Sequence, residues 1–335
     1  MSYLHSYNVL HRNLTTQNVY LDDYFHPKIF GLDQSIELSK SEEIFIEISP
    51  KRFTDFSSPE TFLNCEYSKS SDVYSFALIV CALIANVWFS DDTDFIEEVG
   101  KKGNRPNLNE KIPKCYRLLI EKCWSQNPKE RPTFDEIVFE LKNNDEFFNF
   151  DDFNKEEFKN YQKFIDESPK SFQTDKKFEE VDELIKEKSH LFNKNDFIEK
   201  RLKYSNTEIY LNLDNYEIDK YDNVINKITK TSFKRFNLKK IGDYLKSEIS
   251  NIAKKINIMT KIDHPLIIKF SGYSNVNFNN EPKGFILTNF QMGDGYYKLD
   301  SKNVLITIYG IAYGMAYLHS HNILHRDLKP ENIKC

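Results

Sequence analysis

Apolar residues gather in two long stretches of the chain. The first, residues 76–89, is an almost unbroken apolar run of about fourteen residues, which is shorter than the roughly 20 residues needed to span a bilayer. We therefore expect a buried helix of a globular core over residues 72–88. In the second stretch, 300–319, apolar residues recur three or four positions apart, which predicts a helix with one apolar face. That face consists of Val304, Ile308, Ile311, Met315 and Leu318.

Elsewhere in the chain, the alternation of apolar and polar residues extends over shorter stretches. Two short stretches predict strands near Val19–Leu21 and Pro27–Ile29. Residues 144–215 interleave aromatic side chains with acids, and apolar residues repeat at helical spacing from Phe178 to Leu191. This segment therefore predicts two or three amphipathic helices. Packing of these helices on a neighbouring part of the fold is the simpler interpretation, and docking of a protein partner is the alternative.

Composition narrows the class of protein. The 335 residues are enough for two domains. With 46 basic and 51 acidic residues the net charge is −5, which predicts neither a nucleic-acid-binding protein nor a disordered acidic chain, and no stretch predicts a membrane segment. The five cysteines include no Cys-x-x-Cys pair, and the sequence shows no signal peptide. We therefore expect a reduced, cytoplasmic environment.

One stretch of sequence occurs twice. Met1–Asn18 and Met315–Asn332 are identical at eleven of eighteen aligned positions. An amphipathic helix that ends in a polar turn would predict neither this order of residues nor its repetition. The second copy contains His-Arg-Asp-Leu-Lys-Pro-Glu-Asn at His325–Asn332. This octapeptide resembles the catalytic loop of protein kinases.

The resemblance to protein kinases implies roles for three residues of the octapeptide. Asp327 would accept the proton of the substrate hydroxyl, Lys329 would contact the transferred phosphate, and Asn332 would bind a magnesium ion. In the first copy Asn13 stands at the position of the base and Thr15 at that of the lysine. An amide has no basic site near neutral pH, so we do not expect Asn13 to accept the proton.

Further motifs in residues 1–143 resemble the C-lobe of the tyrosine-kinase-like group of protein kinases. They are Ser58-Pro59-Glu60, Asp72-Val73-Tyr74-Ser75-Phe76-Ala77, Cys123-Trp124, Asn127-Pro128 and Arg131-Pro132-Thr133-Phe134. The resemblance implies an ion pair between Glu60 and Arg131 that stabilises the fold. It also implies that Asp72 braces the catalytic loop, although a helix N-cap would be an ordinary role for this residue.

The C-terminal part of the chain resembles a kinase N-lobe. Lys254–Lys261 corresponds to helix C, and Ile267–Tyr273 and Gly284–Phe290 correspond to two strands. Thr288 corresponds to the gatekeeper residue, which implies that it binds the nucleotide cofactor. Asp300–His319 would then be helix E, which leads into the second catalytic loop.

The expected fold class is therefore α+β and protein-kinase-like, with its lobes in reversed order. A mostly helical C-lobe over residues 1–143 would precede a helical linker over 144–215. A small, strand-rich N-lobe would follow in residues 216–335, together with helix E and the catalytic loop.

The metal-binding motif departs from the kinase pattern. Phe30-Gly31-Leu32-Asp33 stands where kinases have Asp-Phe-Gly. The position of the magnesium-binding aspartate is therefore empty or filled by Gly31. Asp33 is the nearby carboxylate that could replace it.

The nucleotide-binding positions depart from the pattern as well. Glycine is absent between Gly103 and Gly242, so the glycine-rich loop over the ATP phosphates is missing or remodelled. Lys255 replaces the glutamate of helix C, which turns attraction to its lysine partner into repulsion. That lysine has three candidates, each of which fits one placement of gaps: Lys234, Arg235 and Lys246.

The resemblance implies ATP and magnesium as cofactors and a protein as substrate or partner. It leaves three functions open: a Ser/Thr kinase, a pseudokinase that serves as a scaffold or regulatory module, and an inactive fragment of a tandem-kinase protein. Phosphoryl transfer depends on placed cations and positioning. We therefore expect it to be impaired in this chain.

The two ends of the chain predict a contact with each other. The first copy keeps only the last residues of helix E, Met1–Ser6, whereas a complete helix E lies at Asp300–His319 with no C-lobe after it. Apolar surface left in water costs roughly 25 cal/mol per Å². We therefore expect Asp300–His319 to pack against the helix of residues 72–88, within one chain or between two. We also expect the copy with Asn13 to hold the catalytic place and displace the copy with Asp327.

Overall fold

The computed structural model describes part of this chain. The described residues are 9–10, 19–21, 26–29, 35–37, 45–46, 56–85, 98–99, 102–105, 108, 112–149, 153–172, 211–218, 224–229, 232–237, 256, 258–274, 278–279, 285–289, 301–320 and 323–324. They form a mixed fold of helices and small sheets.

The described residues divide into two compact units. The helical unit comprises those within Met1–Ser168, Pro265–Ile267 and Met292–Cys335. The sheet unit comprises those within Pro169–His264 and Ile268–Gln291. The units cut across the sequence segments 1–143, 144–215 and 216–335, because the last helix of the chain joins the helical unit and the middle segment contributes to both units.

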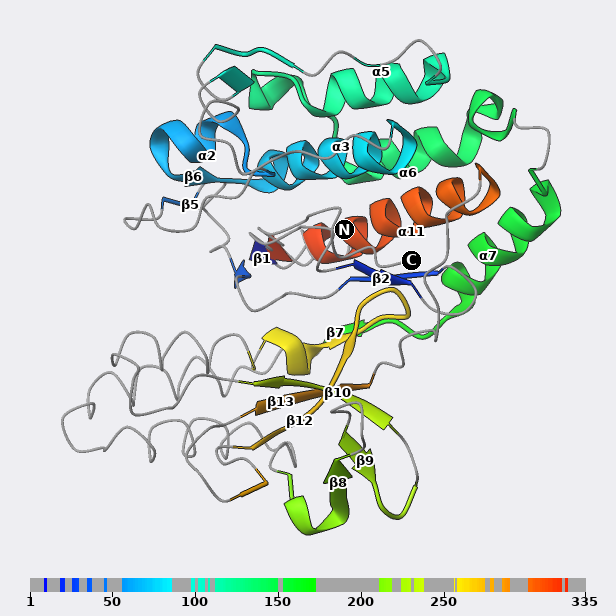
Figure 1. The fold of residues 1–335 in the computed structure, drawn as a ribbon. Helices are drawn as coiled ribbons and strands as arrows, with labels where there is room; N and C mark the ends of the chain where they lie inside the picture. Colours follow the sequence, from blue (N-terminus) through cyan, green and yellow to red (C-terminus); the bar gives the residue numbers. More distant parts are fainter. Residues whose placement is uncertain are drawn as a thin grey trace. The chain divides into compact units, whose positions relative to one another are not determined.

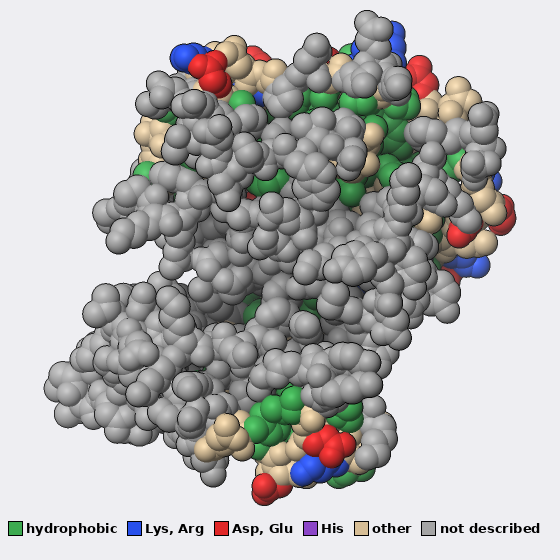
Figure 2. Space-filling model, viewed as in Figure 1, with side chains coloured by type: hydrophobic (Ala, Val, Ile, Leu, Met, Phe, Trp, Pro, Cys, Tyr) green, Lys and Arg blue, Asp and Glu red, His purple; other side chains and the backbone are tan. Residues whose placement is uncertain are grey.

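Six described α-helices build the helical unit. They are α2 (Pro59–Asn64), α3 (Lys69–Ala85), α5 (Lys114–Cys123), α6 (Phe134–Asn143), α7 (Lys155–Glu167) and α11 (Ser301–Ser320). Every residue from Ser71 to Cys81 in α3 is buried, as expected for a helix that is apolar on all sides. The predicted buried core helix is therefore confirmed, and it begins three residues before Asp72. On the face seen in Figure 2, described apolar side chains gather across these helices, and described charged side chains lie at the periphery.

Helix α11 lies inside the helical unit although it comes from the other end of the chain. It packs against α6, α3 and the strand β3 (Pro27–Ile29), and Figure 1 shows the orange α11 beside the cyan α3. The contact predicted between this helix and the helix that contains Asp72 is therefore present. Burial goes beyond the predicted single face, because every residue from Asn303 to His319 except Tyr313 is buried.

Small strands complete the helical unit. The predicted strands near Val19–Leu21 and Pro27–Ile29 are confirmed as the antiparallel pair β2 (Val19–Leu21) and β3. Strand β5 (Phe45–Ile46) pairs with β6 (Glu66–Tyr67). The third group has the order β1 (Val9–Leu10), β4 (Ile36–Glu37) and β14 (Ile323–Leu324).

The sheet unit contains a five-stranded antiparallel sheet. Its order is β12 (Lys269–Ser274), β13 (Phe285–Asn289), β10 (Ser232–Asn237), β9 (Val224–Asn226) and β8 (Tyr216–Ile218). Strands β12 and β13 confirm the two strands predicted over Ile267–Tyr273 and Gly284–Phe290. Val224 and Leu287 are fully buried, and Phe233 packs against them. A separate pair joins β7 (Ser171–Phe172) to β11 (Ile262–Asp263).

Two predicted helical regions are described only in part. Helix α7 confirms an amphipathic helix in the middle segment, and it buries Phe158, Tyr161 and Ile165. The stretch from Phe178 to Leu191 lies outside the described residues. Of the predicted helix over Lys254–Lys261, residue 256 and residues 258–261 are described and helical.

Candidate functional site

The residues predicted to carry the chemistry lie just beyond described strands. Asp327, Lys329 and Asn332 lie outside the described residues, and so do Asn13 and Thr15 of the first copy. The structure instead describes the strands that lead into the two loops. Strand β1 ends one residue before His11, and strand β14 ends one residue before His325.

Strand β4 pairs with both of these strands. Val9 and Leu10 lie opposite Glu37 and Ile36. Ile323 and Leu324 lie opposite the same two residues. Which of the two loops holds the catalytic place lies outside the described residues, so the expected displacement of the second copy by the first stays a prediction.

A buried pair joins α11 to α3 immediately before β14. The His319 Nε2 lies 2.5 Å from Asp72 Oδ2, and both side chains are at most 2% exposed. Phe134 packs edge-on against the imidazole at a centroid distance of 4.8 Å. Asp72 was expected to brace the catalytic loop, and its described partner is a histidine four residues before β14. The end of α11 is thus held at one point of α3.

We expect His319→Leu to lower the free energy of unfolding of the helical unit by about 1–3 kcal/mol. The substitution keeps an apolar side chain against Phe134 but removes the hydrogen bond between the imidazole and the buried Asp72 carboxylate, and a hydrogen bond to a charged group contributes about that much. Chemical denaturation followed by tryptophan fluorescence measures the change. Asp72→Asn/His319→Leu should recover part of the loss, because the amide carries no charge. No recovery in the double variant would contradict the interaction.

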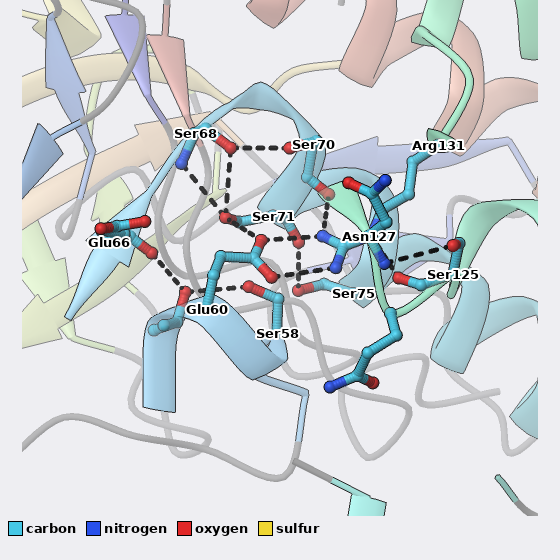
Figure 3. A network of polar contacts seen from close by, with 12 residues as sticks. Ser58, Glu60, Glu66, Ser68, Ser70, Ser71, Ser75, Ser125, Asn127 and Arg131 are labelled. Atoms are coloured by element: carbon cyan, nitrogen blue, oxygen red, sulfur yellow. Dashed lines mark hydrogen bonds and ion pairs between the residues drawn. The ribbon is translucent and has the colours of Figure 1, made fainter. Parts of the chain in front are cut away.

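Glu60 and Arg131 form the predicted ion pair (Figure 3). Arg131 Nη1 and Nη2 donate to Glu60 Oε1 and Oε2 at 2.8 and 2.9 Å. The Arg131 side chain is fully buried and that of Glu60 is 11% exposed. Burial opposes the charge of Glu60, but the guanidinium outweighs it and holds the pKa of the carboxyl below its ordinary value. This bidentate pair links α2 to the segment before α6.

Further polar groups complete this network. Arg131 also donates to the carbonyl oxygens of Ser70 and Ser125 at 2.9 and 2.8 Å. The Ser71 hydroxyl donates to Glu60 Oε1 at 2.9 Å. Arg105 and Arg131 lie over the Tyr74 ring at 5.3 and 5.0 Å. Burial raises the pKa of Tyr74 to about 12, so the phenol stays neutral at physiological pH. Because Arg131, Glu60 and Ser71 satisfy one another's polar atoms, the network stabilises the fold.

The predicted gatekeeper lies in the sheet unit. Thr288 is fully buried on β13, and its Cα partners are Phe270 on β12 and Lys234 on β10. Its hydroxyl has no hydrogen-bond partner among the described residues. A buried hydroxyl without a partner is uncommon in folded proteins.

The strand register separates two candidates for the nucleotide-binding lysine. Lys234 stands directly opposite Thr288, whereas Arg235 stands opposite Leu287, which belongs to the apolar core of the sheet. Directly opposed residues of an antiparallel pair share a face of the sheet. The register therefore puts Lys234 on the face of Thr288. Lys246 and Lys255 lie outside the described residues.

Sequence reasoning missed two contributors to these sites. His319 had no predicted role, although the Leu-His-Ser tripeptide around it is repeated at Leu4-His5-Ser6, and this repetition was the available signal. Arg105 had no predicted role either, and no motif marks it.

None of the described helices combines the length and apolarity that crossing a bilayer requires.

Comparisons with known proteins find kinase sequences at both ends of the chain. Residues 1–141 match the family described as protein tyrosine and serine/threonine kinase. Residues 220–335 match the family described as protein kinase domain. The motifs that resembled the tyrosine-kinase-like group lie in the first of these segments.

Individual relatives agree with these families. A probable LIM domain-containing serine/threonine-protein kinase of Dictyostelium discoideum is 33% identical over 146 residues, or 42% of this chain and 22% of the relative. The dual specificity protein kinase pyk3 of the same organism is 33% identical over 42% of this chain and 10% of its own length. The serine/threonine/tyrosine-protein kinase HT1 of Arabidopsis thaliana is 30% identical over 44% of this chain and 37% of its own length. The chain thus spans well under half the length of these relatives.

Proposed function

We propose that this chain, which belongs to the protein kinase superfamily and resembles its tyrosine-kinase-like group, is a signalling protein with an impaired kinase domain assembled from both ends of its sequence. In this proposal a C-lobe in residues 1–143 comes first, a linker in 144–215 follows, and residues 216–335 supply the N-lobe and helix E. The reversed order makes the fold a circular permutation of a kinase domain.

The observation that carries this proposal is the place of α11. The helix follows the N-lobe in sequence, yet it packs on α6 and α3 of the helical unit and pairs His319 with Asp72. Burial of nearly all its residues supplies the apolar contact that neither end of the sequence could make alone. The five-stranded sheet that contains Thr288 supports an N-lobe in the other unit.

Described residues fit a nucleotide in one respect. The buried hydroxyl of Thr288 without a described partner suits a ligand with polar edges, and Lys234 shares its sheet face by register. Asn332 would hold magnesium, Asp327 would accept the substrate proton and Lys329 would contact the phosphate. Magnesium, when bound, neutralises charge on the phosphates during transfer.

Several groups that kinases use are absent from the sequence, and their absence favours impaired phosphoryl transfer. The sequence has no glycine from residue 104 to residue 241, so a hairpin between β8 and β9 would cover the phosphates without the close backbone approach that glycine permits. The Asp-Phe-Gly aspartate is absent at Phe30-Gly31, and Lys255 replaces the glutamate of helix C. The loss of the aspartate and of the glutamate removes placed charges on which phosphoryl transfer depends, and the loss of the glycines removes positioning of the phosphates.

Two other functions are compatible with the kinase families. A pseudokinase scaffold would bind a protein partner without transfer. A fragment of a tandem-kinase protein would bring α11 to a C-lobe outside this chain, and the packing of α11 on α3 and α6 disfavours that option. An active Ser/Thr kinase would need a replacement for the missing aspartate, for which Asp33 is the nearest carboxylate in sequence.

Nucleotide binding tests the proposal. We expect millimolar Mg-ATP to raise the Tm only slightly and phosphate transfer to a generic protein substrate to stay at background. A ligand at about 100 times its Kd would add roughly 2.7 kcal/mol to the stability of the folded state, which a melting experiment detects readily. A large, magnesium-dependent rise in Tm would contradict impaired binding.

A matched pair of variants identifies the lysine if such a rise occurs. Lys234→Met would then abolish it and Arg235→Met would preserve it, because only Lys234 shares the sheet face of Thr288. Loss of the rise in Arg235→Met alone would contradict the register assignment. Asp327→Ala should leave any binding of nucleotide intact and remove residual transfer.

A further inference from the structure

We propose that helix α7 is a strap that holds α11 of its own chain in the helical unit. The proposal rests on the assembly of the kinase domain from both ends of the sequence. Helix α7 spans Lys155–Glu167 and therefore lies outside both kinase matches, which cover residues 1–141 and 220–335. Its contacts reach the middle of α11, at Tyr309, Gly310 and Tyr313.

Aromatic side chains form the first part of the strap. Phe158 meets the ring of Tyr309 edge-on at a centroid distance of 5.0 Å, and Tyr161 lies 6.3 Å from the same ring. Phe158 and Tyr161 are each 3% exposed, and Tyr309 is fully buried. Aromatic pairs in this geometry contribute beyond the area they bury. Without α7, the Tyr309 face of α11 would lose these apolar neighbours.

Gly310 is the point at which the strap and the β2–β3 pair both reach α11. A Cβ atom at Gly310 would lie 2.3 Å from the Tyr161 hydroxyl oxygen and 2.3 Å from Pro27 Cγ. The absence of a side chain is therefore what permits this approach. On the other side of Tyr161, the His26 ring stacks at a centroid distance of 4.3 Å. Tyr161 is thus enclosed by α11 and the start of β3.

A polar contact extends the strap by one turn. The Tyr313 hydroxyl donates to Asp166 Oδ1 at 3.1 Å, and Lys142 Nζ lies 3.5 Å from Asp166 Oδ2. Burial raises the pKa of Tyr313 above its ordinary value, and the nearby Asp166 carboxylate adds to the shift. The phenol therefore keeps its proton and remains a donor. The carboxylate ties α7 to both α11 and α6.

The lengths of the connections indicate that the strapped α11 belongs to the same chain. Three residues separate α7 from β7 in the sheet unit, and eleven separate β13 of that unit from α11. At about 3.6 Å per step these connections reach at most roughly 14 and 43 Å. An α11 from a second copy would bring its own sheet unit and, close behind it, its own α7. That α7 would compete for the same face of α11, so closure within one chain is favoured.

Hydrogen exchange of the full chain tests the strap. Tyr161→Ala should speed the exchange of α11 amides at least about tenfold relative to those of α5, because the large buried ring that contacts α11 is removed. Lys163→Ala changes the same helix at an exposed side chain and should alter the exchange rate of neither the α11 nor the α5 amides. If Tyr161→Ala speeds exchange in α7 but leaves α11 as protected as before, the strap is disproved while the assembly from both ends stands. If α11 is unprotected in the unmodified chain, the assembly itself is wrong.

A milder variant guards against general unfolding by Tyr161→Ala. Tyr313→Phe removes only the hydrogen bond to Asp166, and it should speed α11 exchange several-fold with an unchanged circular dichroism spectrum. An unchanged exchange rate would exclude the polar contact from the strap. A crosslinking experiment distinguishes closure within one chain from closure between two. The double variant Asp166→Cys/Tyr313→Cys is prepared once with normal and once with heavy isotopes. The two preparations are mixed and crosslinked with a short bismaleimide. Crosslinked peptides of a single isotope support closure within one chain, and mixed-isotope peptides overturn it.

Discussion

Ile311→Asp is expected to unfold the helical unit. The substituted residue lies more than 140 positions after α7, the described helix of this unit that precedes α11 in the sequence. Ile311 is fully buried in the helix that packs against α3 and α6. An unpaired carboxylate there costs several kcal/mol, and domains have only about 5–15 kcal/mol of stability. Trp88 and Trp124 are the two tryptophans of the chain, so their fluorescence reports unfolding of its N-terminal part.

Ile228→Asp is the matched control for this experiment. Ile228 is 78% exposed in the sheet unit, so the same change of side chain should alter the free energy of unfolding by less than about 0.5 kcal/mol. If Ile311→Asp leaves the tryptophan transition where it is in the unmodified chain, α11 does not complete the helical unit. The proposed assembly from both ends would then fail.

Arg131→Ala is expected to lower the free energy of unfolding of the helical unit by about 3–5 kcal/mol. The substitution leaves the buried Glu60 carboxylate without its bidentate partner, and breaking a buried pair from one side costs about this much. Denaturant unfolding followed by tryptophan fluorescence measures the change. Lys155→Ala breaks the exposed pair with Asp145 and should cost less than about 0.5 kcal/mol.

The pH dependence of this loss follows from the pKa of Glu60. In the folded chain that pKa is lowered from 4.5, so the carboxylate contributes stability above pH 4.5 that is lost as the pH falls through the folded pKa. In Arg131→Ala, the serine hydrogen bonds to Glu60 remain but the guanidinium no longer offsets burial, so the pKa of Glu60 should rise, which favours the protonated folded form at low pH. The difference in stability between the two proteins should therefore shrink as the pH is lowered from 7 towards 4. A difference that grows on acidification would contradict the ion pair as its source.

Local sequence was sufficient where neighbours in the chain decide the structure. The all-apolar run around Phe76 predicted α3, because only a buried helix can hide apolar residues on every side. The strands β12 and β13 were predicted through the resemblance of the C-terminal part to a kinase N-lobe. The Glu60–Arg131 pair was predicted through kinase motifs, since both residues stand in motifs whose spacing this chain retains. The catalytic residues Asp327, Lys329 and Asn332 remain predictions from sequence.

Tertiary structure decided whatever depends on residues far apart in the chain. The pairing of β4 with both β1 and β14 joins residues far apart in the chain, and no local pattern singles out β4. The position of Lys234 opposite Thr288, and of Arg235 opposite Leu287, needed the register of β10 against β13, because a shift of one residue moves every side chain to the other face.

The difference between what the sequence determines and what only the tertiary structure determines is clearest in α11. Its sequence determined a helix with a strongly apolar face, because helical periodicity is a local property of the chain. Its packing on α3 was predicted from the apolar face that needed cover, and its packing on α6 was not predicted. Its enclosure by α7 through Tyr161, Gly310 and Tyr313 was not predicted either. The physical reason is that hydrophobic burial is non-directional. Apolar residues in the sequence determine that a surface must be covered, and only the folded chain determines which helix covers it.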